Sequence, residues 1–338
     1  MIYLVLLSIL IYTYKRKEYL LKAVNSVLSN EFDPSEFEII VVKGFMDNDI
    51  DNYLFKNGIR TLFVDDKSLG VKLARGIREC KGVFICFLDD DDEFESDKLE
   101  IISNLLEKDD KLDFIHNSIS VINEEGNAIS TNPKENVSGS ISFNPGKYQN
   151  STLSRLIRHR GDWYLSAMCI RKSVILKVID ELDFIDQSVD KFVFYAALNF
   201  GKEMMMIDNR VTRYRLHQST TTYAGTMNEF MEKRRVFFEN SVRVFNEIVE
   251  ISRGHSGSNL ANCQLIQHRI NLYFISGNQN HKVTMTELLK YVSCLKYSKT
   301  RFQLIWIFAY FVRKISLEIS RLLYFKFFEV SFRKVLDY

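Results

Sequence analysis

Short apolar runs alternate with segments of helical periodicity through the first part of this chain. Runs rich in β-branched and aromatic residues predict strands at residues 5–12, 38–42, 61–64, 83–88 and 112–116. Between the first two runs, Leu20, Val24 and Val27 recur on one face of a helix, and residues 73–77 and 99–105 repeat this spacing. Strands and helices that alternate in this way predict a mostly parallel sheet covered by helices on both faces.

The second half of the chain has a different pattern. Residues 129–149 are rich in Asn, Ser, Gly and Pro, which indicates a loop region. Further strands are predicted at residues 163–170, 204–207 and 211–216, and helices at residues 173–179, 190–199, 228–251, 260–275, 284–295 and after 299. Because strand signals end near residue 223, we expect an α/β domain over residues 1–223 and a helical extension over residues 224–338.

Composition narrows the class of protein. The 338 residues are 46% hydrophobic, enough for a core, and their net charge of +2 gives no reason to expect a nucleic-acid partner. The five cysteines lie far apart without a C-x-x-C or zinc-like spacing, so we expect separate buried thiols in a reducing compartment. The opening apolar run lacks a basic start and is too short to span a bilayer, which favours a strand and a cytoplasmic protein.

Four consecutive aspartates follow the apolar run at residues 83–88. They therefore lie where a buried strand leaves the sheet, and ligands of open α/β sheets collect at that edge. Neighbouring carboxylates repel one another by roughly 1 kcal/mol per close pair in water, so a cation is expected among them. A divalent cation that carries a phosphorylated substrate would meet this need, whereas the simpler alternative is a solvated acidic turn before a helix.

The order of motifs resembles the family 2 glycosyltransferases, which have the GT-A fold, over about two thirds of the chain. Thr13-Tyr14-Lys15-Arg16 and the helix after it are similar to the family's "PTYNR" start. Residues 70–77 look like its "G…ArN.Gi" helix, and residues 82–92 look like the segment that ends in its DXD motif. The resemblance implies a mostly parallel central sheet flanked by helices, with a helical C-terminal extension.

In this family the DXD aspartates hold the donor's ribose and a metal that bridges its two phosphates. The resemblance places Asp89 at the ribose and Asp91 at the metal, with Asp90 and Asp92 less defined, and the metal would be Mn²⁺ or Mg²⁺. The resemblance implies Asp91, Asp89 and His217 as the metal ligands, with contact to the diphosphate as the alternative role of His217. The expected donor-binding residues are Thr13, Tyr14, Arg16, Asp47, Lys72, Arg75, Asp89, Asp90 and Arg215, with Arg213 as an alternative to Arg215 for the phosphate charge.

A transfer with inversion needs a base that takes the proton of the acceptor hydroxyl. The resemblance places this base at Asp190, where a helix begins, with Asp186 in reserve; taken alone, an Asp at this position is usually an N-cap. Trp163 and Tyr164 lie where the family tends to form the wall beside the acceptor, although core packing would explain them equally well.

Two departures from the family pattern matter. The family commonly has "DDGS" after the second strand, and its first acid recognises the nucleobase, but this chain has Lys43 there. An ammonium only donates hydrogen bonds, so either Asp47 or Asp49 replaces that acid or the base is recognised differently. Val189 also replaces the usual Glu before Asp190. A catalytically silent sugar-nucleotide-binding or scaffold protein of the same fold is therefore the alternative function.

The resemblance thus implies transfer of a sugar from a nucleoside-diphosphate sugar, with UDP favoured, to a glycan or a lipid-linked glycan. The tail after residue 299 carries more Lys and Arg than acids, interleaved with aromatic residues. It predicts either a helix in the interface of an anionic membrane or a helix packed on the protein or in a homodimer. We expect a protein that is peripheral at the cytoplasmic face in the first case.

Overall fold

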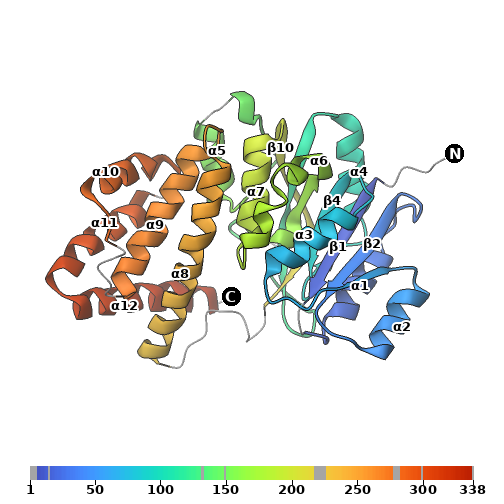
Figure 1. Cartoon of the computed structure of the whole chain (residues 1–338), viewed down its shortest axis with the longest axis horizontal. Coiled ribbons are helices and arrows are strands. Elements are labelled where there is room, and N and C mark those ends of the chain that lie inside the picture. Colours follow the sequence, from blue (N-terminus) through green and yellow to red (C-terminus); the bar gives the residue numbers. More distant parts are fainter. Residues whose placement is uncertain are drawn as a thin grey trace.

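The computed structural model describes residues 6–13, 16–130, 133–147, 150–216, 226–276, 282–297 and 300–336. Figure 1 shows a sheet with flanking helices at one end of the molecule and a group of helices at the other. The strands are β1 Leu7–Thr13, β2 Phe37–Lys43, β3 Arg60–Phe63, β4 Phe84–Asp89, β5 Glu93–Phe94, β6 Leu112–Ile122, β7 Ala128–Ser130, β8 Ile141–Phe143, β9 Met168–Arg171 and β10 Glu203–Arg215. The fold is the mixed α/β arrangement that sequence analysis predicted.

Helices cover the sheet and continue the chain beyond it. Those in the sheet part are α1 Leu20–Leu28, α2 Asn48–Lys56, α3 Leu69–Glu79, α4 Lys98–Lys108, α5 Asn150–Arg158, α6 Lys172–Ile175 and α7 Val189–Phe200. Those that follow are α8 Met227–Ile251, α9 Ser258–Ser276, α10 Met285–Ser293, α11 Thr300–Ile315 and α12 Leu317–Leu336. None of these described helices is long and apolar enough to cross a bilayer.

The sheet has the strand order β3-β2-β1-β4-β9-β6-β10-β5. The pairs β1–β2, β1–β4, β2–β3 and β6–β10 are parallel, whereas β9 runs antiparallel to both of its neighbours. β1 and β4 are therefore central, and their carboxyl ends meet at one edge. That edge carries the aspartates.

Alternation along β1 explains why helices cover both faces. Successive side chains of a strand point to opposite faces of the sheet. Leu10 belongs to the core cluster on one face, while Ile9 and Ile11 belong to the cluster on the other. All three are fully buried, so the sheet lies between two apolar layers.

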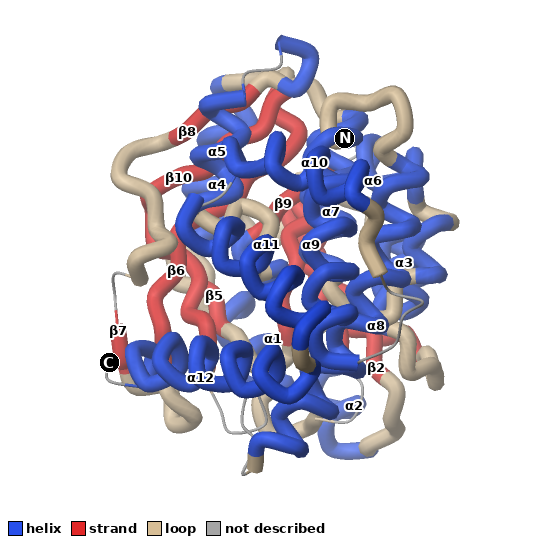
Figure 2. The backbone as a smooth tube through the Cα atoms, turned by 90° about the vertical axis from the view of Figure 1, so that its left-hand side faces the viewer, coloured by secondary structure: helices blue, strands red, loops and turns tan. Residues whose placement is uncertain are grey.

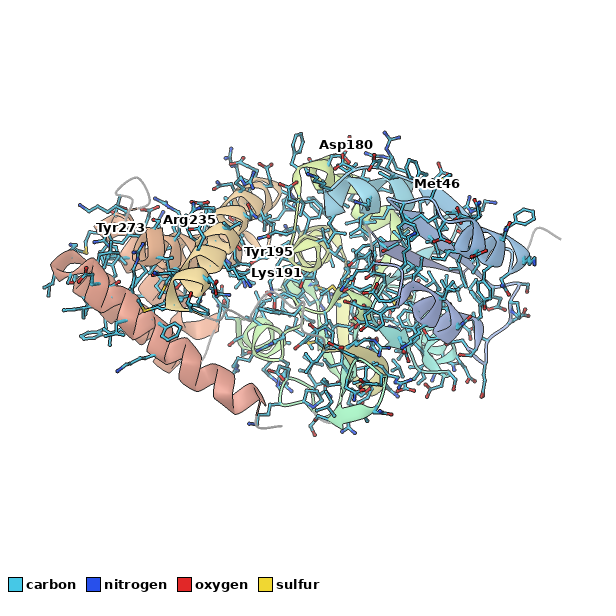
Figure 3. The ribbon with its side chains drawn as sticks, turned by 90° about the horizontal axis from the view of Figure 1, so that it is seen from below. Met46, Asp180, Lys191, Tyr195, Arg235 and Tyr273 are labelled. Carbon is cyan, nitrogen blue, oxygen red and sulfur yellow. A yellow bond between two sulfur atoms is a disulfide. The ribbon has the colours of Figure 1, made fainter. Side chains whose placement is uncertain are left out.

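The C-terminal helices share a core with the sheet part. Every residue of α7 from Lys191 to Leu198 is buried, as expected for a helix covered on all sides. Tyr195 of α7 packs edge-on against Phe245 of α8 and donates a 2.8 Å hydrogen bond to Gln264 of α9. Figure 3 labels Lys191 and Tyr195 at this junction. The helical part is therefore packed on the sheet part through α7.

Three local predictions differ from the structure. Residues 163–170 were expected to be one strand, but β9 begins only at Met168, because Tyr164 adopts a left-handed backbone with φ 62°. β10 is one strand where two were expected, and shifts of register near Arg210 explain the interrupted apolar pattern. The region at residues 129–149 contains the short strand β8.

The cysteine prediction was wrong for four of the five residues. Cys86 and Cys169 face each other on β4 and β9 and form a disulfide. Cys263 of α9 forms a second disulfide with Cys294, which follows α10. Cys80 is the free, buried thiol among the described residues. Separations of 83 and 31 residues hid both pairs, because strand pairing and helix packing bring distant positions together.

Candidate functional site at the end of β4

The four aspartates form the turn that follows β4 at the edge of the sheet. β1 pairs in parallel with β4, and Tyr12 lies opposite Asp89. The end of β1 therefore brings Thr13 beside the aspartates. Asp90 and Asp92 are buried at 3% and 1% exposure, so these carboxylates lie largely away from water.

Three of the carboxylates converge. One oxygen each from Asp89, Asp91 and Asp92 lies within 4.8 Å of the others. Among the described residues, Asp89 Oδ1 and Asp92 Oδ2 are buried and have no hydrogen-bond partner. Buried polar oxygens without donors are costly, and oxygen ligands are those that Mg²⁺ and Mn²⁺ prefer. The cluster therefore fits a divalent cation.

The electrostatics of the cluster point the same way. Burial raises the pKa of Asp89 well above its ordinary value, and the charges of Asp92 and Asp91 raise it further. Burial and then the charge of Asp91 raise the pKa of Asp92 to about 8. A cation at this position would offset both burial and repulsion. Of the predicted metal ligands, Asp89 and Asp91 are thus brought together, Asp92 joins them, and His217 lies outside the described residues.

Arg16 bridges two of the aspartates. Its Nη2 lies 2.5 Å from Asp90 Oδ1, and its Nη1 lies 2.5 Å from Asp91 Oδ2. The Thr13 hydroxyl donates a 2.9 Å hydrogen bond to the carbonyl of Arg16, which holds Arg16 near the end of β1. Thr13 and Arg16, both expected at the donor, therefore lie at the cluster, while Tyr14 lies outside the described residues.

Arg215 lies beneath the aspartate turn rather than on its surface. Its side chain has no exposed area, and its Nε donates to the carbonyl of Asp91 at 2.8 Å. Its Nη1 donates to the carbonyls of Asn123 and Glu124 at 2.9 Å, and its Nη2 pairs with Glu93. These contacts occupy most of the guanidinium N–H groups, so in this structure Arg215 holds the turn in place.

The remaining residues predicted to bind the donor lie at the start of α2 and on α3. Asp47 is the N-cap of α2, where it accepts from the Ile50 N–H, and it pairs with Lys17 at 2.8 Å. Lys72 of α3 is buried at 1% exposure and donates to the carbonyl of Asp66. Arg75 is exposed on α3.

Lys43 ends β2, beside Thr13 of β1. Its side chain is 1% exposed, and its ammonium lies 2.7 Å from Asp51 Oδ1 and donates to the carbonyl of Phe45 at 2.7 Å. A buried ammonium is stable only with such partners. Where the family pattern has an acid, this chain therefore has Lys43, and Asp51 on α2 supplies the negative charge that its ammonium needs.

Asp190 lies in the first turn of α7, close enough to the aspartate cluster for the charges to interact. Its charge contributes to the raised pKa of Asp89. Burial raises its own pKa, and the adjacent Lys191 opposes that shift. Ser188 is the N-cap and has φ 55°, so Asp190 is not the capping residue. Asp186, the reserve candidate, is half exposed and lies 3.9 Å from Arg243 of α8.

Lys191 ties the start of α7 to the segment that precedes β9. Its ammonium lies 3.0 Å from the Asp162 carboxylate, which is buried at 1% exposure, and donates to the Asp162 carbonyl at 2.8 Å. The amide of Gln264 on α9 also donates to this carboxylate at 3.2 Å. A helix of the C-terminal part thus contributes to the support of Asp190.

Two neighbouring aromatic residues, Trp163 and Tyr164, contact α7 and β10. Trp163 is 43% exposed, with Lys191 Nζ 4.1 Å and Arg160 4.8 Å from its ring centre. Tyr164 packs edge-on against Tyr214, with ring centres 5.0 Å apart. Burial and the charge of Asp92 raise the pKa of Tyr214. Trp163 is therefore partly available to a ligand, and Tyr164 beside it is half-buried.

Sequence reasoning missed one buried cation below the site. Lys98, the first residue of α4, is fully buried and donates to the Ser166 carbonyl at 2.7 Å and to Thr212 Oγ1 at 2.8 Å. Burial lowers its pKa well below the ordinary value, while the charge of Asp92 opposes this. The neighbouring apolar residue Leu99 is the one sequence feature that could have indicated burial of Lys98. We did not expect burial, because a Lys at the start of a helix is ordinarily solvated.

The chain matches a protein-family model over its first half. The model described as "Glycosyl transferase family 2" covers residues 8–175. A protein of Rickettsia felis named "Uncharacterized glycosyltransferase" is 33% identical over 126 residues, which is 36% of this chain and 20% of that protein. A protein of Rickettsia bellii with the same name is 30% identical over 138 residues, again 20% of its length. The chain thus spans about a fifth of these relatives.

Solved structures match over more of the chain. Residues 1–349 of S. aureus TarS in complex with UDP-GlcNAc superpose with a TM-score of 0.57 and 14% identity, over 97% of this chain and 92% of that one. A longer S. aureus TarS chain gives a TM-score of 0.52 and 15% identity, over 86% of this chain and 48% of that one. At this identity the match shows the shared fold.

Proposed function

This chain belongs, through residues 8–175, to glycosyl transferase family 2, and we propose that it transfers a sugar from a nucleoside-diphosphate sugar to an acceptor hydroxyl. The convergence of Asp89, Asp91 and Asp92, with buried oxygens that lack donors, is the observation that carries the proposal. The similar fold of TarS, solved with UDP-GlcNAc and with UDP, supports a UDP-sugar as the donor.

Asp89, Asp91 and Asp92 would hold Mn²⁺ or Mg²⁺ in this proposal. When bound, the cation would neutralise the charge that develops on the leaving diphosphate. Arg16 already contacts Asp90 and Asp91, and its side chain is 39% exposed, so it can also reach a phosphate oxygen at the same edge. Arg215 would not contact the donor but would keep the aspartate turn in the position that holds the cation.

Asp190 is the proposed general base. It would take the proton of the acceptor hydroxyl as that oxygen attacks the anomeric carbon from the side opposite the diphosphate, which inverts the configuration. Burial raises its pKa, which makes the carboxylate a stronger base than an exposed aspartate. The ion pair of Lys191 with Asp162 fixes the adjacent residue and so restricts the position of the carboxylate.

The acceptor would lie on the Trp163 side of the site. The partly exposed indole is next to Lys191, and an aromatic face suits the apolar face of a sugar ring. We propose a glycan or a lipid-linked glycan as the acceptor class. Residues 224–338 would then form a helical extension whose helices α8 and α9 pack against α7 and the segment before β9. A homodimer stays a prediction.

Release of UDP from UDP-GlcNAc with Mn²⁺, with and without a panel of glycan acceptors, tests the proposal. Asp91→Asn should lose both metal-dependent binding and turnover. Asp190→Asn should keep donor binding in a thermal-shift assay but lose at least about a hundredfold in turnover. Asp183→Asn, an exposed acid seven residues earlier, is the matched control and should be unchanged. Donor binding without turnover in the unmodified protein would support the catalytically silent alternative.

A further inference from the structure

The end of the molecule farthest from the sheet exposes large apolar side chains. Figure 2 looks onto this end, where α10, α11 and α12 lie toward the viewer. The apolar residues exposed there are Met285, Leu289 and Val292 on α10, Phe308, Phe311 and Ile315 on α11, and Ile319, Leu322 and Leu323 on α12. We call these nine residues the apolar end face. Exposed clusters of this extent usually mark an interaction site.

The three helices turn their other sides toward α9. Tyr310 of α11 packs on Tyr273 with ring centres 5.4 Å apart, and Arg321 of α12 donates to the carbonyl of Ile275 at 2.7 Å. The disulfide of Cys294 with Cys263 links the end of α10 to the same helix. The buried sides of these helices thus pack on α9, and no part of the chain that the structure describes covers the apolar end face. Ile315 is 84% exposed and Leu289 is 65% exposed, values that a side chain in a packed core never reaches.

Charge identifies the kind of surface that would cover this face. Residues 282–338 contain eleven Lys and Arg and four Asp and Glu, a net +7, so residues 1–281 carry −5 to give the chain's +2. Lys290, Lys314 and Lys326 are exposed within one helical turn of apolar end-face residues, and none has a recorded salt bridge with a described residue. Where the side chains of these helices are described, Glu318 is the exposed acid. Positive charge is therefore concentrated where apolar residues are exposed.

We propose that the apolar end face binds the surface of an anionic lipid bilayer. Apolar side chains interleaved with lysines suit the boundary between acyl chains and negatively charged headgroups. A second copy of this chain is the less suitable partner, because two faces of the same positive charge would repel each other. Since the described helices do not span a bilayer, the attachment would be peripheral. The inference does not depend on the proposed sugar transfer.

Flotation of the full-length protein with vesicles tests this inference without any sugar nucleotide. Vesicles of phosphatidylcholine with phosphatidylglycerol should bind the protein, and vesicles of phosphatidylcholine alone should bind it much less. The double variant Lys314→Glu/Lys326→Glu should weaken binding at least about twenty-fivefold, since each basic residue near an anionic surface contributes about fivefold. Ile315→Ser with Phe311→Ser should weaken binding to both kinds of vesicle.

Phe55→Ser is the matched control, because Phe55 is 83% exposed on α2, at the other end of the molecule. This variant should bind vesicles like the unmodified protein. Light scattering after size-exclusion chromatography measures the mass of each variant in parallel. Absence of flotation, or flotation that Phe55→Ser reduces as much as the end-face variants do, would overturn the inference. A dimer that Ile315→Ser dissociates, without vesicle binding, would assign the face to a second copy instead.

Discussion

The aspartate cluster makes metal binding strongly dependent on pH. In the metal-free protein, burial and the charge of Asp91 raise the pKa of Asp92 to about 8. A cation binds the deprotonated carboxylate, so below that pH it must displace a proton. With a pKa of about 8, about 1% of Asp92 is ionised at pH 6 and about half at pH 8, which predicts about 50-fold tighter Mn²⁺ binding at pH 8.

The same shift predicts the sign of the stability change. An aspartate with a raised pKa in the folded state binds protons that the unfolded chain has already lost above pH 4 or so. The metal-free protein should therefore lose stability as the pH rises from about 4 to about 8, and Mn²⁺ should restore more of it at the higher pH. Asp89, whose pKa is also raised by burial, acts in the same direction.

Calorimetric titration with Mn²⁺ in two buffers of different ionisation enthalpy measures both the affinity and the protons released. Release close to one proton or more is expected at pH 6.5 or so, and less at pH 8 or above. Asp92→Asn should bind Mn²⁺ more weakly at pH 8 and show a smaller pH dependence, since Asp89 keeps a pKa raised by burial. Asp97→Asn, an exposed acid five residues later, should retain it. An affinity that stays constant between pH 6 and pH 8 in the unmodified protein would refute this reasoning.

Three further outcomes are expected. Arg16→Gln should bind Mn²⁺ alone about two- to fivefold more tightly, because it frees Asp91, yet bind UDP more weakly; titration of each ligand checks the opposite signs. Gly70→Ala should lower the free energy of unfolding, measured by urea denaturation, by about 1–3 kcal/mol or more, since its Cβ would overlap the backbone oxygen of Leu182. Gly146→Ala should lower it less, because its Cβ would meet only the Asn144 side chain at 3.3 Å. Thiol titration of the denatured, unreduced protein should find only Cys80, whereas five thiols would contradict both disulfides.

The sheet and the acidic edge were predictable because each depends on a local pattern. Residues 84–88, directly before Asp89, are all buried, and the length and composition of this run alone indicate a central strand. α2 was missed because it buries only Ile50 and Leu54, which gives a weak apolar stripe. The start of residues 163–170 was misassigned because the left-handed backbone of Tyr164 depends on tertiary packing, which composition does not reveal.

The candidate site was predictable in its parts but not in its contacts. Placing Asp190 near the aspartates rested on the order of motifs, and the electrostatic effect of Asp190 on Asp89 agrees with that placement. The role of Asp92 in the cluster and the burial of Arg215 depend on which way side chains turn in a crowded loop. Neither orientation leaves a signal in the spacing of residues.

Helix α7 belongs equally to both parts of the molecule. Its first turn carries Asp190, and its buried length contacts the sheet part on one side and α8 on the other. A protein ended after β10 would leave Tyr195 and its neighbours facing water, without the outer layer that α8 and α9 provide. The boundary drawn near residue 223 therefore marks a change of secondary structure, not a place where the chain can be cut into two units that fold alone.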